Sequence, residues 1–256
     1  MIKKYLGFGL LAFLFMVPAF CFTQSAAEAD ARSLLSAFIS YVDLRISGVQ
    51  NSLEVLASAS EVRSGEWKTM QGLLGAYQKT DGGLIVFYVL PDGSYYTVDK
   101  GLMDAKLSDR SYFPDLMAGR RVIGSLVISK STGQRSAVIA VPLKAGEKVV
   151  GAIGASVFLD KLADQIDSAL APRKDVAFFA LAPNGLTALH RKIDRHFLDP
   201  REMGSETLKK AVNEILSKTE GEVTYDFDNT LKKAIFRKSD LTQWRFAINM
   251  NAASGK

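Results

Sequence analysis

The sequence offers very little thiol or imidazole chemistry. Its 256 residues include one cysteine, Cys21, and two histidines, His190 and His196. A single cysteine excludes an internal disulfide and a zinc site built from several thiolates. The sequence also contains no HExxH pair, no Walker loop, no G-x-S-x-G motif and no Ser-His-Asp order. These absences predict a protein that is not an enzyme.

Long apolar runs are also scarce. The longest covers Leu6 to Phe20 behind two lysines, about fifteen residues, which suits an export signal and is short for a membrane span. Ser25-Ala26-Ala27 supplies small residues for cleavage, and Phe20 is too bulky a neighbour for a lipidated Cys21. We predict that residues 1–27 are a signal peptide, with retention as an uncleaved inner-membrane anchor as the alternative. Export without disulfides fits a bacterial periplasmic or secreted protein.

Strong charge of one sign is absent. The net charge of +5 is small for this length, and basic residues are interspersed with acidic ones. A nucleic-acid footprint would need basic residues clustered on one surface. The sequence therefore predicts no nucleic-acid partner.

Proline is absent from residues 26 to 62, where apolar residues recur at helical spacing. The stripe consists of Leu35, Phe38, Val42, Ile46, Val49, Leu53 and Leu56. It predicts a long helix over residues 28–64. Such a helix either lies along the body of the protein or pairs with a second copy as a homodimer.

Two later segments follow the same pattern. "GLIVFYVLPDGSYYTVD" and "DVAFFALAPNGLTALHR" each combine an apolar strand, a Pro-x-Gly turn and a second strand. Each is followed by a helical or irregular stretch and then by two more strands. The pattern predicts a duplicated α+β module with an antiparallel sheet in each copy. We place the modules at residues 65–158 and 173–250, with a linking helix at 159–172 and a tail at 251–256.

The stretch "LSDRSYFPDLMAGR" places Arg110, Tyr112 and Phe113 within four residues. A guanidinium presents a two-pronged donor array that matches a carboxylate, and aromatic rings form rigid walls for a ligand. The alternative is structural: Arg110 pairs with Asp109 or Asp115 at the surface.

The order of these segments resembles a double Cache sensor domain, the extracytoplasmic part of many bacterial chemoreceptors and sensor histidine kinases. The matching pieces are the long helix, "VFYVLPDGSYYTVD", "LSDRSYFPDLMAG", "VISKSTGQRSAVIAVPL" and "VVGAIGASVFLDKL". The resemblance implies a long helix followed by two tandem PAS-like modules, one distal and one proximal to the membrane. It also implies a role in signal transduction, such as chemotaxis.

The resemblance further implies a ligand pocket in the distal module. The residues carried over to it are Arg110, Tyr112, Phe113, Tyr96, Tyr88, Ser129, Lys130 and Ser156. Tyr88 and Tyr96 belong either to the pocket or to the core. Amino-acid-binding and amine-binding members place aspartates at the positions of Ser129 and Ser156. Their absence favours a small organic acid or a neutral molecule over an amino acid or amine, because a buried ammonium needs a carboxylate.

The expected function is that of an exported small-molecule sensor. Since the chain ends soon after "WRFAINM", we expect it to act through a separate membrane receptor or kinase. The alternative is a ligand-free dimeric scaffold of the same fold. No cofactor is expected, and the spacing of His190 and His196 does not predict a metal site.

Overall fold

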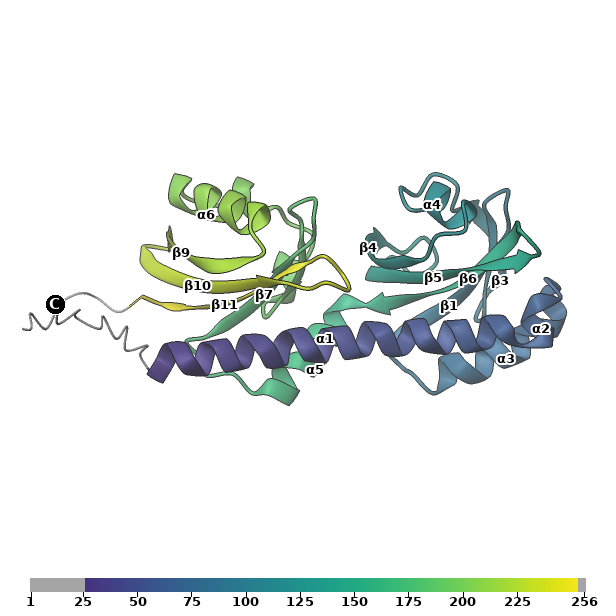
Figure 1. The fold of residues 1–256 in the computed structure, drawn as a ribbon, viewed down its shortest axis with the longest axis horizontal. Helices are drawn as coiled ribbons and strands as arrows, with labels where there is room; N and C mark the ends of the chain where they lie inside the picture. The colour runs from purple at the N-terminus through teal and green to yellow at the C-terminus, as the bar shows by residue number, and fades with distance from the viewer. Residues whose placement is uncertain (1–25, 253–256) are drawn as a thin grey trace, which may run out of the picture.

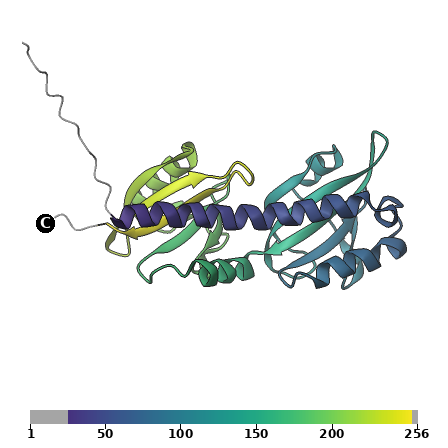
Figure 2. The ribbon, with the colours of Figure 1, turned by 60° about the horizontal axis from the view of Figure 1, so that its bottom comes forward.

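A computed structural model of the chain describes residues 26–252. One long helix, α1 (Ala26–Ser58), runs beneath two modules that lie side by side along it (Figures 1 and 2). The short α2 (Ser60–Arg63) and then α3 (Trp67–Lys79) turn the chain back at the far end. The molecule is therefore elongated, and α1 packs against both sheets along its length.

The first module is built on a six-stranded antiparallel sheet in the order β3-β2-β1-β6-β5-β4. Its elements are β1 (Leu84–Val89), β2 (Ser94–Thr97), β3 (Gly101–Lys106), α4 (Phe113–Met117), β4 (Val122–Ile128), β5 (Arg135–Ala145) and β6 (Lys148–Phe158). Helices α1 and α3 cover one face of the sheet, and α4 with its flanking loops covers the other (Figure 1).

The second module has a five-stranded antiparallel sheet in the order β8-β7-β11-β10-β9. Its elements are β7 (Ala177–Leu181), β8 (Thr187–His190), the 3₁₀ turns η1 (Ile193–Arg195) and η2 (Pro200–Glu202), α6 (Glu206–Ser217), β9 (Glu220–Phe227), β10 (Thr230–Lys238) and β11 (Arg245–Asn251). If β3 is left out, the first sheet (β2-β1-β6-β5-β4) and the second (β8-β7-β11-β10-β9) have their corresponding strands in the same order. The duplication predicted from the sequence is thus present in the topology.

The apolar stripe of α1 is buried against the protein's own sheets. Phe38 is fully buried, and its ring lies 5.0 Å from that of Phe178 and 4.9 Å from that of Phe246. Further along the helix, Ile46 and Leu53 are also fully buried. Burying each such side chain contributes about 1.5–3 kcal/mol. Of the two arrangements open from the sequence, the structure shows the helix along the body of the protein.

The two modules meet through α5 (Leu159–Leu170) and through a direct contact between their sheets. Gly124 forms a bulge in β4 with a φ of 73°, and a Cβ atom there would lie 3.3 Å from the Trp244 ring. Trp244 is fully buried at the start of β11. In addition, Arg135 of the first module donates a hydrogen bond to the carbonyl of His196 at 3.3 Å.

The predicted α+β class, with one long helix and two antiparallel modules, is confirmed. Helix α3 and strand β3 were not predicted from the sequence. Within residues 26–252, no helix has the length and apolar character needed to cross a bilayer. The predicted signal run from Leu6 to Phe20, together with Cys21, lies outside the described residues.

Candidate functional site

A cavity of about 20 Å³ lies between the first sheet and the loop that leads into α4. We call it the first cavity. Five residues predicted from the sequence line it: Arg110, Tyr112, Ser129, Lys130 and Ser156. The other lining residues are Ile85, Phe87, Tyr95, Thr97, Leu107, Val127, Ser131 and Val138. Residues far apart in the sequence therefore converge on one small space.

Strand alternation decides which side chains reach the first cavity. In β2, Tyr95 and Thr97 face the cavity, so Tyr96 between them faces the opposite side of the sheet. In the neighbouring β1, Phe87 faces the cavity and Tyr88 does not. The sheet thus presents a phenol, a hydroxyl and a phenyl ring to the cavity.

Arg110 enters from the loop after β3. Its Nη2 donates a hydrogen bond to the carbonyl of Ile128 at 2.7 Å. Among residues 26–252 it forms no direct ion pair with a carboxylate, so the surface pair considered from the sequence does not form, although the charge of Arg110 contributes to lowering the pKa of Asp109. A guanidinium with one bond to a neutral carbonyl keeps most of its donors available for an anion.

Lys130 lines the same cavity but is already neutralised. Its Nζ contacts both carboxylate oxygens of Asp109 at 2.7 Å and the carbonyl of Lys106 at 2.6 Å. The hydrogen bond from Lys130 lowers the pKa of Asp109, which keeps that carboxylate ionised. Arg110 is therefore the cationic group of the cavity lining that has no direct ion pair among the described residues.

Two buried phenols complete the polar lining. Tyr95 is 3% exposed, and its hydroxyl has no hydrogen-bond partner in the described part of the chain. Burial raises the pKa of Tyr95 and raises that of Tyr112 to about 12, although Arg110 opposes both shifts. Both hydroxyls are consequently neutral and able to donate. A buried hydroxyl without a partner costs about 1–3 kcal/mol, so Tyr95 would gain from a ligand acceptor.

The remaining polar groups are hydroxyls, and no acidic side chain lines the first cavity. Ser129 Oγ lies 3.1 Å from Ser131 Oγ and accepts a hydrogen bond from the Thr132 backbone N–H. Ser156 is buried on β6, opposite Ile85 in the register of β1. With one guanidinium that is bonded only to a carbonyl, hydroxyl donors and no acid in the lining, the cavity is chemically suited to an anion or a neutral acceptor.

Three of the predicted site residues lie elsewhere. Tyr88 and Tyr96 are on the side of the sheet that packs against the helices, where Tyr96 stacks on Trp67 with ring centroids 4.9 Å apart. Phe113 is buried in the same cluster as Tyr112 but does not line the cavity, because the backbone at Tyr112 already has helical dihedrals and the two rings diverge. Sequence reasoning in turn missed Tyr95, Thr97 and Phe87, each one position from a residue that was considered.

Both histidines are engaged in hydrogen bonds within the described part of the chain. Within residues 26–252, no group of three or more His, Cys, Asp or Glu side chains is arranged to hold a metal ion. His196 is buried, with Nδ1 2.7 Å from Asp160 and Nε2 3.2 Å from the carbonyl of His190. It lies at the junction between the modules and not in the first cavity.

Solved structures of other proteins share this arrangement of elements. The extracellular domain of the histidine kinase rpHK1S-Z16 superposes with a TM-score of 0.72 and 17% identity, over 88% of this chain and 95% of that one. The sensory domain of the Campylobacter jejuni chemoreceptor Tlp3, solved with isoleucine bound, gives a TM-score of 0.63 and 13% identity over 88% and 92%. The chain has the double Cache fold.

Comparison at the level of sequence gives one partial match to a curated protein. No family model matches the sequence. A curated relative, the toxin coregulated pilus biosynthesis protein I of Vibrio cholerae, is 29% identical over 182 residues. The match covers 66% of this chain, and the chain spans only 28% of the length of that relative. The structural relatives are extracellular or sensory domains of kinases and chemoreceptors.

Proposed function

We propose that this chain is an extracytoplasmic sensor module whose first cavity binds a small organic carboxylate. The observation that carries the proposal is that two groups meet at one cavity: Arg110, which forms no direct ion pair among residues 26–252, and the buried hydroxyl of Tyr95, which has no hydrogen-bond partner there. A carboxylate would accept hydrogen bonds from both groups and compensate the guanidinium charge.

Because no acidic side chain lines the first cavity, an amino acid is disfavoured as the ligand. The C. jejuni chemoreceptor Tlp3 has the same fold and was solved with isoleucine, which carries an ammonium as well as a carboxylate. Here Val127, Ser129 and Ser156 line the cavity and none can compensate an ammonium. Burying an unpaired ammonium costs several kcal/mol. We therefore favour acids of the pyruvate, lactate or dicarboxylate kind, followed by neutral molecules, over amino acids and amines.

The size of the first cavity sets a further requirement. About 20 Å³ accommodates roughly one water molecule, so an acid of three or four carbons needs the lining to open. The loop carrying Arg110 is held by its hydrogen bond to Ile128 and by the Lys130–Asp109 pair. Binding would replace the Ile128 carbonyl with the stronger carboxylate acceptor, which supplies free energy for that opening.

Isothermal titration calorimetry tests the proposed ligand class. The purified chain is titrated with pyruvate, lactate and succinate, and with isoleucine and putrescine as ammonium-bearing competitors. We expect binding of an acid and an affinity reduced by about 10–100-fold in Arg110→Ala. Arg120→Ala is the matched control, since Arg120 is exposed and pairs with Asp115. Equal acid affinity in Arg110→Ala and the unmodified chain would contradict the proposal.

The small volume of the first cavity also favours a second candidate, a ligand-free scaffold of the same fold. In that case the lining side chains fill their own pocket. A thermal-shift screen separates the two candidates, because a ligand that binds the native state raises the melting temperature by mass action. A screen of organic acids without any stabilising compound would favour the scaffold.

The proposed location is the bacterial periplasm or exterior, and the proposed output is a separate receptor or kinase. The sensory domains of similar fold belong to such proteins. Mass spectrometry of the N-terminus from a periplasmic fraction tests export. Removal of residues 1–27 would support a free protein, whereas their retention would support an anchored one.

A further inference from the structure

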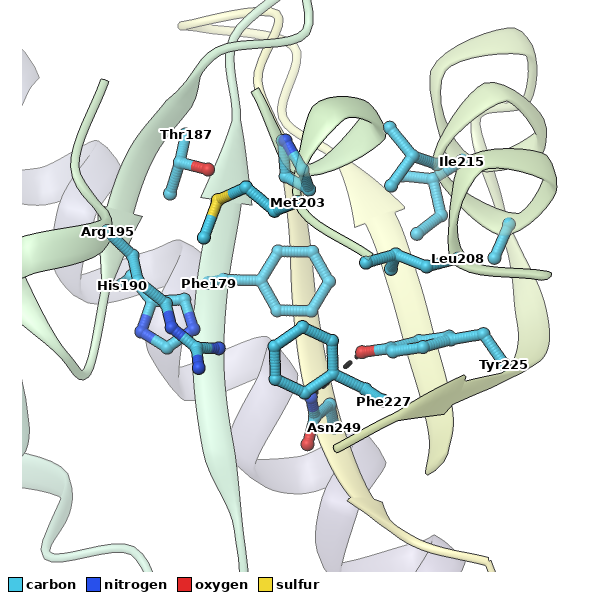
Figure 3. Close-up of a pocket in the computed structure, with 13 residues that line it drawn as sticks. Phe179, Thr187, His190, Arg195, Met203, Leu208, Ile215, Tyr225, Phe227 and Asn249 are labelled. Atoms are coloured by element: carbon cyan, nitrogen blue, oxygen red, sulfur yellow. Dashed lines mark hydrogen bonds between the residues drawn. The ribbon is translucent and has the colours of Figure 1, made fainter. Parts of the chain in front are cut away.

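The second module contains its own cavity, which lies between its sheet and α6 and has a volume of about 50 Å³. We call it the second cavity. Figure 3 shows the rings of Phe179, Tyr225 and Phe227 gathered around it, with Met203 above them and Leu208 to the right. His190 and Arg195 lie together at the left (Figure 3). The cavity thus has an apolar part and a basic part.

Arg195 differs from its neighbouring arginines. Its guanidinium stacks over the Phe227 ring at 4.7 Å and has no carboxylate partner among residues 26–252. In the same module, Arg191 pairs with Asp167 at 2.7 Å and Arg201 pairs with Asp199 at 2.6 Å. The stacked guanidinium is therefore the lining group of the second cavity whose charge is uncompensated.

Two further donors are directed to this cavity. Nδ1 of His190 accepts a hydrogen bond from the Lys192 backbone N–H at 2.7 Å, so the proton of the neutral ring is on Nε2. Nε2 has no partner in the described part of the chain, and neither does the hydroxyl of Thr187, a residue only 2% exposed. Burial is the main cause that lowers the pKa of His190 to about 3, which keeps the ring neutral near pH 7.

No acidic side chain lines the second cavity. Asn249 donates a hydrogen bond from Nδ2 to the Tyr225 hydroxyl at 2.9 Å, so these two groups satisfy each other in part. The unsatisfied groups are the donors of Arg195, His190 and Thr187. This donor set, opposite an apolar wall, matches a carboxylate that carries a short hydrocarbon tail.

The position of Arg195 repeats that of Arg110. Asp109-Arg110 and Asp194-Arg195 each follow the first hairpin of a module and precede the helix that covers the outer face of its sheet. In each module the arginine lines a cavity on that outer face of the sheet and forms no ion pair with a carboxylate among the described residues. The duplicated fold therefore carries a duplicated anion-facing arginine.

We propose that the second cavity is a separate binding site for a short-chain monocarboxylate of two to four carbons. A dry cavity of about 150 Å³ is known to hold benzene, so a cavity of about 50 Å³ suits a smaller tail. Access comes from an open groove on the same module, which shares His190, Arg195, Phe227 and Asn249 with the cavity. The carboxylate contacts Arg195, His190 and Thr187, and the tail lies against Met203 and Leu208.

The chain has two histidines, which gives this site a direct probe. In protein labelled with ¹⁵N-histidine, the imidazole signals of His190 and His196 can be followed separately during titration with butyrate near pH 7. We expect a saturable shift of the His190 signals. His196, which does not line the cavity, should change little and serves as the internal control for folding.

Variants separate this site from the one proposed in the first module. Arg195→Ala should weaken butyrate binding by about 10-fold or more, whereas Arg173→Ala, at an exposed arginine paired with Asp175, should not. Arg110→Ala should leave the His190 shift intact. If Arg195→Ala disturbs the His196 signals, Thr187→Val replaces it and should weaken binding as well. Absence of a saturable His190 shift, or its loss in Arg110→Ala alone, would overturn the second site.

Discussion

At the scale of single residues, the arginines of this chain differ in the groups that their guanidinium groups contact. Most of the arginines around the two cavities pair with a nearby aspartate, as Arg120, Arg191 and Arg201 do. Arg110 and Arg195 instead contact a carbonyl and a phenyl ring. Neither contact compensates a full positive charge, so both guanidinium groups favour an anionic ligand.

Stability should depend on pH through His190. The pKa of its ring is about 3 in the folded chain and near 6.5 when unfolded. Between these values the unfolded state binds one proton more, so the free energy of unfolding falls as pH falls below 6.5. The positive charge of Arg195, followed by that of Lys192, adds to the effect of burial. From pH 7 to pH 5 we expect a loss of about 2 kcal/mol from this group.

Urea unfolding at both pH values, in buffers free of carboxylates, measures this loss. His190→Asn keeps an acceptor for the Lys192 N–H but does not titrate, and it should lose about 2 kcal/mol less than the unmodified chain over this range. An identical pH dependence in both proteins would show that His190 does not resist protonation in the fold.

At the scale of elements, the bulge in β4 joins the two modules. Gly124 has a φ of 73° and lies beside the Trp244 ring, whereas Gly133 has nearly the same φ, 72°, with open space where a Cβ would be. Gly133→Ala should cost about 1–2 kcal/mol from backbone strain alone. Gly124→Ala should cost more, because the methyl group also crowds Trp244. Chemical unfolding of both variants gives the difference, and equal costs would mean that the contact between modules adapts freely.

Helix α1 should be held by its buried stripe and not by its exposed face. Phe38→Ala removes a ring in contact with Phe178 and Phe246 and should lower the free energy of unfolding by about 3–5 kcal/mol. Leu44→Ala, at a residue that is 72% exposed, should change it by no more than about 0.5 kcal/mol. Thermal and urea unfolding measure both. A large effect at Leu44 would indicate that the exposed face packs against something in solution.

The elements were easier to predict from the sequence than the site. Helix α1 and the two hairpins follow from apolar spacing and Pro-x-Gly turns, which are local signals. The sequence does not show which alternate residues of β2 face the cavity. The sheet is covered on both faces, so "SYYT" is compatible with either orientation. Tyr96 was therefore chosen where Tyr95 lines the first cavity. Arg195 was overlooked, although the repeated Asp-Arg pair was visible in the sequence.

At the scale of the whole molecule, the contact between β4 and Trp244 connects the two proposed sites. Strand β4 carries Val127 of the first cavity and, three positions earlier, Gly124 in contact with Trp244. Trp244 directly precedes β11, which carries Asn249 of the second cavity. A ligand that shifts β4 therefore acts on a packed contact of the second module, which is a physical basis for coupling between the modules.

The oligomeric state should depend on which face of α1 is left exposed. Because its apolar stripe is buried within the chain, a homodimer through this helix would have to use the other face, where Leu44 and Val55 are each 72% exposed. Two such side chains bury little area, so we expect a monomer at micromolar concentration. Sedimentation velocity measures this. A dimer that dissociates in the Leu44→Glu/Val55→Glu variant would contradict the expectation and support the scaffold.

The most direct measurement is a crystal structure of the chain with the tightest-binding organic acid. We expect the carboxylate to lie in the first cavity, within about 3 Å of the Arg110 guanidinium and the Tyr95 hydroxyl. We also expect Arg110 to leave the Ile128 carbonyl. An acid bound elsewhere, with Arg110 still donating to Ile128 and the first cavity still closed, would contradict the account.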